Sequence, residues 1–143
     1  MSIDQYIEFA ARHPILILSF VGVLGLLLYG EFRRLTRCWD ELKPQEAVLL
    51  MNHEDPLLLD VREANEVADG RIKGARHIPL GALRQRLEEL EPWKSREVIV
   101  YCRSGNRSAQ ASDILCKAGF ERVHNLKGGV LAWQGENLPL VRK

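Results

Sequence analysis

The hydrophobic and polar positions divide the chain into a long apolar run near the N-terminus and a longer segment in which short apolar runs alternate with helical patterns. The apolar run covers residues 14–30, contains no charged residue and has only Ser19 to offer a polar face. As a helix it would be roughly 25 Å long, the short end of the length that crosses the hydrocarbon core of a membrane. Because a helix of a soluble core needs a polar face, the pattern favours a transmembrane helix.

A cleaved signal peptide is the alternative interpretation of this run. Signal peptides begin with a basic stretch and end at a site of small residues. The residues before the run include two acidic side chains, Asp4 and Glu8, and one basic side chain, Arg12, so this stretch is not basic. No small-residue cleavage site follows the run. We therefore expect an uncleaved transmembrane helix at residues 14–30 after a short non-cytoplasmic N-terminus at residues 1–13.

Basic residues are concentrated after the apolar run. Arg33, Arg34 and Arg37 follow it closely, whereas Arg12 and the amino terminus precede it. Positive residues next to a membrane helix tend to remain in the cytoplasm. The pattern thus predicts a single-pass protein of the cell (inner) membrane whose C-terminal part faces the cytoplasm.

The remainder of the chain has the alternating pattern of an α/β domain. Residues 31–39 form a charged juxtamembrane linker, and apolar strands then alternate with helices. We expect strands at residues 56–60, 75–78, 98–101 and 122–125, and helices at residues 44–51, 63–69, 80–90, 108–115 and 128–134. This alternation predicts parallel strands joined by helical crossovers that cover both faces of the sheet.

Composition narrows the function classes. The 143 residues allow one domain with an appendage, and 20 basic against 19 acidic residues give a net charge of +1. Such a balance indicates no general affinity for nucleic acid. The three cysteines, Cys38, Cys102 and Cys116, are odd in number and lack Cys-x-x-Cys spacing. We therefore expect no zinc site and no disulfide framework, and a reducing compartment.

The polar segment after the strand at residues 98–101 bears most directly on function. It reads Cys102-Arg103-Ser104-Gly105-Asn106-Arg107 and leads into the helix expected at residues 108–115. A cysteine there follows a strand, where parallel sheets bind ligands, and lies beside a helix N-terminus that favours a thiolate. The two arginines add positive charge, and Gly105 permits a tight turn. A buried structural cysteine is the alternative, which fits Cys116 in its apolar helical stretch better.

This loop resembles the active-site loop of rhodanese-type sulfurtransferases. Further matches to the family pattern follow the family's order: Leu57–Glu63 with Asp-Val-Arg, Gly70–Pro79 with Gly-Ala and Ile-Pro, and Gly119–Trp133 with Gly-Gly and Trp. The resemblance covers about residues 40–138, leaves residues 139–143 as a tail, and departs at Arg71, where the family often has histidine. It implies a rhodanese-like parallel five-stranded sheet flanked by helices, with the remaining strand near Cys38 and Trp39. The transmembrane helix expected from the apolar run would precede this domain.

The resemblance also implies the activity of a sulfurtransferase without cofactor or metal, which the apolar run would anchor in the membrane. The Cys102 thiolate would attack the outer sulfur of an anionic donor such as thiosulfate, hold it as a persulfide and pass it to a thiol or other nucleophilic acceptor. Backbone N–H groups of the loop would stabilise the negative sulfur. The expected substrate-binding residues are Arg103, Ser104, Gly105, Asn106 and Arg107. The two arginine side chains either steer the donor or are simply solvated.

Two residues are expected to support the site from the end of an earlier strand. Asp60 closes the strand at residues 56–60, and we expect it to hold loop N–H groups or an arginine rather than to act as a general base. Arg62 lies four residues before Glu66 on a short helix, so the two side chains are expected to pair.

Two other function classes remain open. Phosphatase loops of related shape place arginine after a cysteine and five further residues, whereas here Ser108 occupies that position, so the loop fits sulfur better. A non-enzymatic, membrane-tethered module that docks a partner or senses persulfides or oxidants would keep the same cysteine. The anchor is also compatible with a membrane protein partner.

Overall fold

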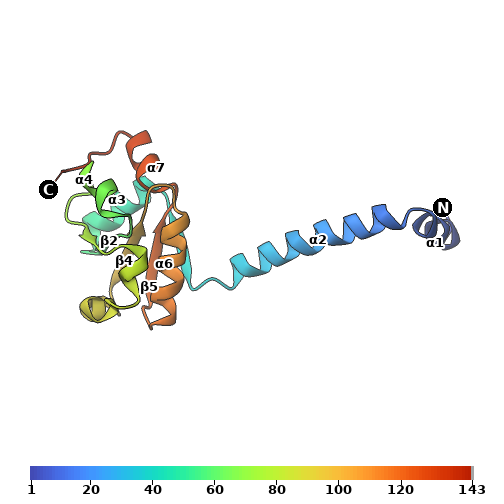
Figure 1. Ribbon diagram of the computed structural model, residues 1–143, viewed down its shortest axis with the longest axis horizontal. Helices are drawn as coiled ribbons and strands as arrows, with labels where there is room; N and C mark the ends of the chain where they lie inside the picture. The colour runs from blue at the N-terminus through green and yellow to red at the C-terminus, as the bar shows by residue number, and fades with distance from the viewer. Residues whose placement is uncertain (143) are drawn as a thin grey trace. The chain divides into compact units, whose positions relative to one another are not determined.

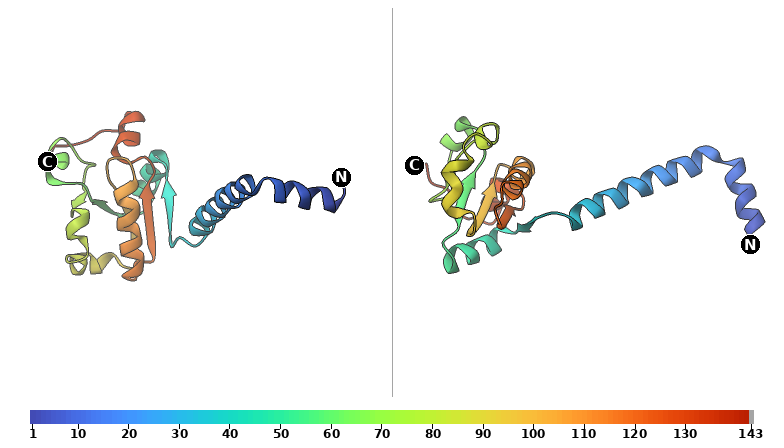
Figure 2. Two further views of the ribbon diagram at one scale, coloured as in Figure 1. Left: turned by 45° about the vertical axis from the view of Figure 1, so that its right-hand side comes forward. Right: turned by 90° about the horizontal axis from the view of Figure 1, so that it is seen from below.

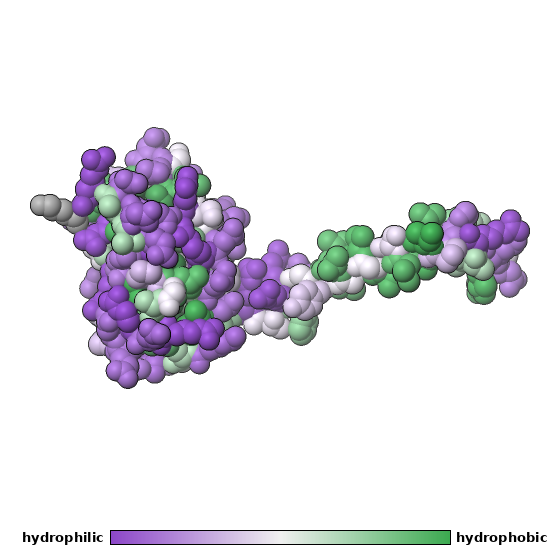
Figure 3. Space-filling model, in the orientation of Figure 1, coloured by the Kyte–Doolittle hydropathy of each residue, from purple (hydrophilic) through white to green (hydrophobic). Residues whose placement is uncertain are grey.

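A computed structural model describes residues 1–142, which divide after Arg37 into two compact units. The first unit consists of helix α1 (Ile3–Arg12) and the long apolar helix α2 (Pro14–Leu35). Pro14 begins α2, where its missing N–H removes no helical bond. The apolar side chains of α2 are exposed along its length (Figure 3). By length and composition, α2 is apolar enough to cross a membrane.

The second unit is built on a five-stranded parallel sheet in the order β1-β5-β4-β2-β3 (Figure 1). Its strands are β1 (Trp39–Leu42), β2 (Leu57–Asp60), β3 (Arg76–His77), β4 (Glu97–Tyr101) and β5 (Arg122–Leu126). All four neighbouring pairs run parallel. The predicted parallel five-stranded sheet is confirmed, and β1 lies where the remaining strand was expected.

Helices cover both faces of this sheet (Figures 1 and 2). One face packs α3 (Pro44–His53) and α7 (Gly129–Gly135), and the other packs the short α5 (Leu80–Leu83) and α6 (Asn106–Lys117). Strand β4 serves both faces, because Val98 and Val100 enter one core while Ile99 and Tyr101 enter the other. The remaining short helix, α4 (Ala64–Ala68), follows β2.

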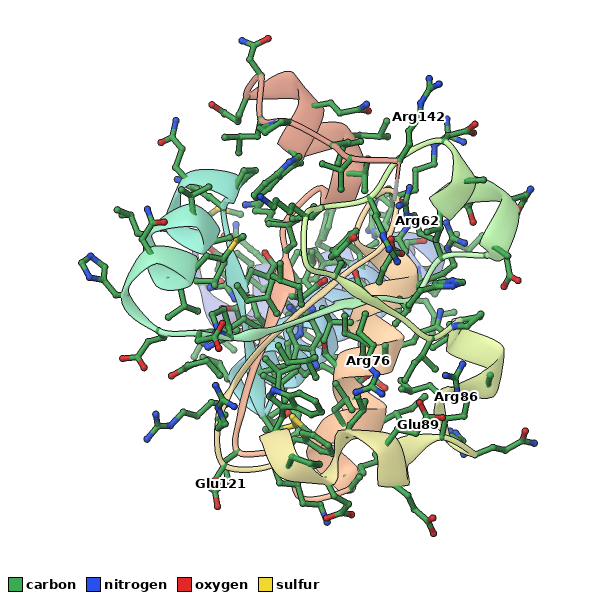
Figure 4. The ribbon with its side chains drawn as sticks, turned by 90° about the vertical axis from the view of Figure 1, so that its left-hand side faces the viewer. Arg62, Arg76, Arg86, Glu89, Glu121 and Arg142 are labelled. Carbon is green, nitrogen blue, oxygen red and sulfur yellow. A yellow bond between two sulfur atoms is a disulfide. The ribbon has the colours of Figure 1, made fainter. Side chains whose placement is uncertain are left out.

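The prediction of a single helix at residues 80–90 is wrong. Helix α5 ends after one turn, and the 3₁₀ helix η1 (Leu87–Trp93) follows it. Pro92 lies inside η1 and has no N–H to donate, which suits a short 3₁₀ segment better than a continued α-helix. On the outside of this segment the Arg86 guanidinium donates to Glu89 Oε1 at 2.6 Å (Figure 4). Leucines spaced by three or four residues fit either kind of helix, so their pattern did not reveal the break.

The cysteine pattern, from which no disulfide framework was expected, did not reveal the bond between Cys38 and Cys116, whose Cα atoms are 6.1 Å apart. Their sequence separation of 78 residues hides this proximity. It arises because β1 begins beside the C-terminal end of α6. The bond also removes the cysteine pattern as an argument for a reducing compartment.

Candidate active site

Cys102 lies at the carboxyl edge of the sheet, between β4 and α6. Its side chain is 1% exposed, and it is the free cysteine of the chain. The chain turns at Gly105, whose φ of 103° is the left-handed conformation that glycine adopts without strain. Helix α6 starts at the next residue, so its first N–H groups are directed back toward the loop.

Hydrogen bonds converge on the Cys102 sulfur. The Gly105 N–H donates to Sγ at 3.1 Å, and the Ser108 hydroxyl lies 3.3 Å from Sγ. Burial raises the pKa of the Cys102 thiol, but hydrogen bonds from the Ser108 hydroxyl and from backbone groups of Ser108, Gly105 and Ser104 outweigh it and lower the pKa. The thiolate therefore forms at lower pH than in an ordinary cysteine, and the thiolate is the nucleophilic form.

Ser108 connects the sulfur to strand β5. Its hydroxyl also lies 2.6 Å from Asn125 Oδ1, so its single proton can turn either to Oδ1 or to the Cys102 thiolate, and the Asn125 amide donates to the Gly105 carbonyl at 3.1 Å. Both Ser108 and Asn125 are buried. Sequence reasoning missed both residues as parts of the site. The signal available for Asn125 was its position two residues after Val123, which places its polar side chain on the same face of β5 as that apolar residue.

Arg107 is held in place by Glu66 of α4. Its two terminal nitrogens donate to the two Glu66 carboxylate oxygens at 2.6 and 2.7 Å. This hydrogen bonding to Arg107 lowers the pKa of Glu66 to about 2, and the same pairing raises the pKa of Arg107. The nearby Cys102 sulfur also raises the pKa of Arg107, which puts the cation within electrostatic reach of the thiolate. The prediction that the Glu66 side chain pairs with Arg62 is therefore wrong, because the Glu66 carboxylate binds Arg107 and Arg62 reaches only the Glu66 backbone carbonyl.

Arg62 instead forms a buried ion pair with Asp60. The Arg62 Nη2 donates to Asp60 Oδ2 at 2.7 Å, and the side chains are 5% and 0% exposed. Asp60 also accepts the Arg62 backbone N–H, and the guanidinium donates to the Gly70 carbonyl at 2.7 Å and the Glu66 carbonyl at 3.3 Å. Figure 4 shows Arg62 among the segments that it joins. The pair fastens the chain on both sides of α4 to the end of β2, and so positions Glu66.

Helix α7 supports the loop from the other side. The Val130 N–H donates to the Cys102 carbonyl at 2.9 Å, and the Leu131 N–H donates to the Arg103 carbonyl at 3.1 Å. Gly129 makes this contact possible, since a Cβ there would lie 2.4 Å from the Cys102 oxygen. The loop carbonyls are thus drawn toward α7, which leaves the loop N–H groups free to face Sγ.

The other loop residues that were predicted to bind substrate direct their side chains away from the protein interior. The side chains of Arg103, Ser104 and Asn106 are exposed. Arg103 lines a cavity of about 230 Å³, with Arg62 and Glu66 also in its wall. Among residues 1–142, no group of three or more His, Cys, Asp or Glu side chains is arranged to hold a metal ion. The chemistry that this arrangement can perform is nucleophilic attack by a hydrogen-bonded thiolate with a cation close by.

Comparisons of the chain with known proteins point to one family. The family model described as the rhodanese-like domain matches residues 43–136. The uncharacterized protein YibN of Escherichia coli K12 is 36% identical over 140 residues, which cover 97% of this chain and 98% of YibN. A sulfurtransferase of Allochromatium vinosum is 44% identical over 92 residues, covering 64% of this chain and 84% of that protein. The crystal structure of a rhodanese-related protein from Thermoplasma volcanium has a TM-score of 0.66 at 29% identity, covering 73% of this chain and 99% of the other.

Proposed function

Since the chain belongs to the rhodanese-like domain family, we propose that it is a sulfurtransferase that carries sulfane sulfur as a persulfide on Cys102. The observation that carries the proposal is the environment of the Cys102 sulfur. It receives the Gly105 N–H at 3.1 Å, contacts the Ser108 hydroxyl and has a lowered pKa. A buried sulfur surrounded by donors suits a group that must bear negative charge before and after it accepts a second sulfur.

The proposed reaction has two steps. In the first, the Cys102 thiolate attacks the outer sulfur of an anionic donor such as thiosulfate, and the donor's sulfur–sulfur bond breaks. Sulfite leaves with the bonding electron pair, and the enzyme holds a negatively charged persulfide. In the second, an acceptor thiolate or other nucleophile attacks the outer sulfur of the persulfide, which restores the Cys102 thiolate. No external oxidant or reductant is needed.

We assign different roles to the loop residues in this reaction. The backbone N–H groups of residues 103–107 stabilise the terminal sulfur of the persulfide, and those of Ser104 and Gly105 already bond the Cys102 sulfur. Arg107 supplies a fixed positive charge because Glu66 holds it. Arg103, exposed and at the cavity wall, is the candidate for contacting the sulfonate of the donor. Asp60 and Arg62 act structurally, through the position of α4.

The purified full chain is expected to form thiocyanate from thiosulfate and cyanide over many turnovers. With thiosulfate alone, Cys102 should gain the mass of one sulfur atom, and cyanide should remove it. Loading without release would support a persulfide carrier or sensor instead of an enzyme. Absence of loading together with hydrolysis of an aryl phosphate would contradict the proposal and favour the phosphatase alternative.

We further propose that α2 anchors the protein in the cell membrane by a single pass, with residues 1–13 outside and the domain at residues 40–138 in the cytoplasm. The support is the exposed apolar surface of α2 and the arginines of its last turn. An anchored domain would receive its sulfur donor or pass its product close to the bilayer, where a membrane protein partner could meet it.

This anchoring predicts that the full chain stays with membranes during alkaline carbonate extraction. The double variant Leu18→Arg/Leu24→Arg should move to the soluble fraction, because two charges in the apolar run oppose insertion. The control variant Leu49→Arg changes an exposed leucine of α3 and should remain membrane-bound. Release of the wild-type chain would contradict the anchor, and digestion of the domain by protease added to intact spheroplasts would contradict its orientation.

A further inference from the structure

The disulfide partners Cys38 and Cys116 lie at the opposite end of α6 from Cys102. Cys102 precedes the first turn of this helix, and Cys116 is its second-last residue. At 1.5 Å per residue, the helix separates the two positions by about 15 Å. Cys38 and Cys116 therefore do not resolve a persulfide on Cys102, and they form a separate sulfur site.

The two cysteines are held next to each other by contacts that do not depend on their bond. Trp39, which follows Cys38, is 7% exposed and pairs with Val123 of β5 in the sheet. Its indole N–H donates to the Asp113 carboxylate at 2.7 Å, one turn of α6 before Cys116. These contacts keep the start of β1 against α6 when the bond is open. The thiols of a reduced pair would then remain neighbours, ready to be oxidised again.

The pair is also accessible to small molecules in solution. Cys38 is exposed, whereas Cys116 is half-buried and packs against the core. A small thiol or disulfide can therefore reach the Cys38 sulfur, with Cys116 as its inner partner. Structural disulfides are commonly buried and inert, while exposed ones exchange more readily.

We propose that Cys38 and Cys116 form a reversible dithiol–disulfide site that exchanges two electrons with small thiols and disulfides. In oxidation, the Cys38 thiolate attacks a small disulfide and releases one thiolate, which leaves a mixed disulfide on Cys38. The Cys116 thiolate then attacks the Cys38 sulfur, the mixed bond breaks and the second small thiolate leaves. The two cysteine protons end on the two small thiols. Reduction follows the same steps in reverse.

Oxidation of this site would stabilise the domain without occupying Cys102. The bond closes a loop spanning 78 residues and ties the first residue of the second unit to α6. Closing so long a loop removes much of the conformational freedom of the unfolded chain. The oxidised form should resist unfolding where small disulfides accumulate, while the free Cys102 thiol remains available.

The test uses the full chain in detergent, equilibrated with glutathione and its disulfide at a series of ratios. Mass-tagged alkylation should show Cys38 and Cys116 passing together from modified to protected as the disulfide fraction rises, and the reverse when glutathione is restored. Oxidation should raise Tm by roughly 15–20 °C, as expected for a loop of this length in a domain of this size.

Variants that each replace one cysteine by serine serve as controls. Cys38→Ser and Cys116→Ser should lose the glutathione-dependent change in Tm and keep the wild-type rate of sulfur transfer, since neither residue contacts Cys102. Cys102→Ser should keep the Tm change, which separates this site from the proposed activity. A bond that resists reduction by millimolar glutathione, or one that never forms in the folded chain, would overturn the proposal.

Discussion

Replacing Cys102 by serine is expected to reduce sulfur transfer from thiosulfate to cyanide by at least about 10³-fold, because serine cannot hold a sulfane sulfur as a persulfide. A hydroxyl is also far less ionised than a thiol whose pKa the site lowers. The fold should be preserved, since serine is slightly smaller than cysteine and its oxygen can accept the Gly105 N–H in place of Sγ. The measurement is the rate of thiocyanate formation, with circular dichroism to verify folding. Residual turnover near the wild-type rate would move the reaction to another residue.

The lowered pKa of Cys102 leads to a prediction about the pH dependence of its alkylation. The rate of alkylation by iodoacetamide should rise at lower pH than for an ordinary cysteine, because the lowered pKa makes the reactive thiolate available there. Ser108→Ala removes the hydroxyl 3.3 Å from the sulfur, so the rise should move to higher pH. The experiment is done with Cys38 and Cys116 oxidised, so that Cys102 is the reacting thiol. An unchanged pH profile in Ser108→Ala would remove Ser108 from the account of the thiolate.

Gly129→Ala is expected to destabilise the domain by about 3 kcal/mol, from a left-handed residue and an overpacked contact together. Gly129 has φ of 57°, and a Cβ there would lie 2.4 Å from the Cys102 oxygen and 2.5 Å from the Arg103 oxygen. Neither oxygen can withdraw, because the Val130 and Leu131 N–H groups bind them. The added methyl group therefore pushes the active loop away from α7.

Displacement of the loop should also lower the rate of persulfide loading by about 10²-fold, the scale of effect expected when reacting groups are misplaced by about 1 Å. Urea unfolding and the loading rate measure the two effects separately. The matched control is Gly135→Ala, at the end of the same helix, where a Cβ meets nothing within 4 Å. Equal stability of the two alanine variants would show that α7 does not press on the loop as described.

Much of the fold follows from local patterns in the sequence. The apolar run predicted a long helix because its hydrophobicity is continuous, and the apolar strands predicted a parallel sheet because helical patterns separate them. The loop at residues 102–107 was recognisable for the same reason, since a strand, a glycine turn and a helix follow one another directly. The division of residues 80–93 into α5 and η1 was not recognisable, because leucine spacing suits both helical forms.

The sequence by itself therefore determined the class of fold, the apolar helix and the strand–turn–helix segment that carries the proposed nucleophile Cys102, as each depends on residues close together in the chain. Only the tertiary structure decided which side chains distant in the sequence meet, both around Cys102 and at the disulfide. Glu66 meets Arg107 across 41 residues, Ser108 meets Asn125 across 17, and Cys38 meets Cys116 across 78. These contacts depend on which strands become neighbours and where each helix ends. The free energy of packing the whole domain sets both, and no single segment encodes it.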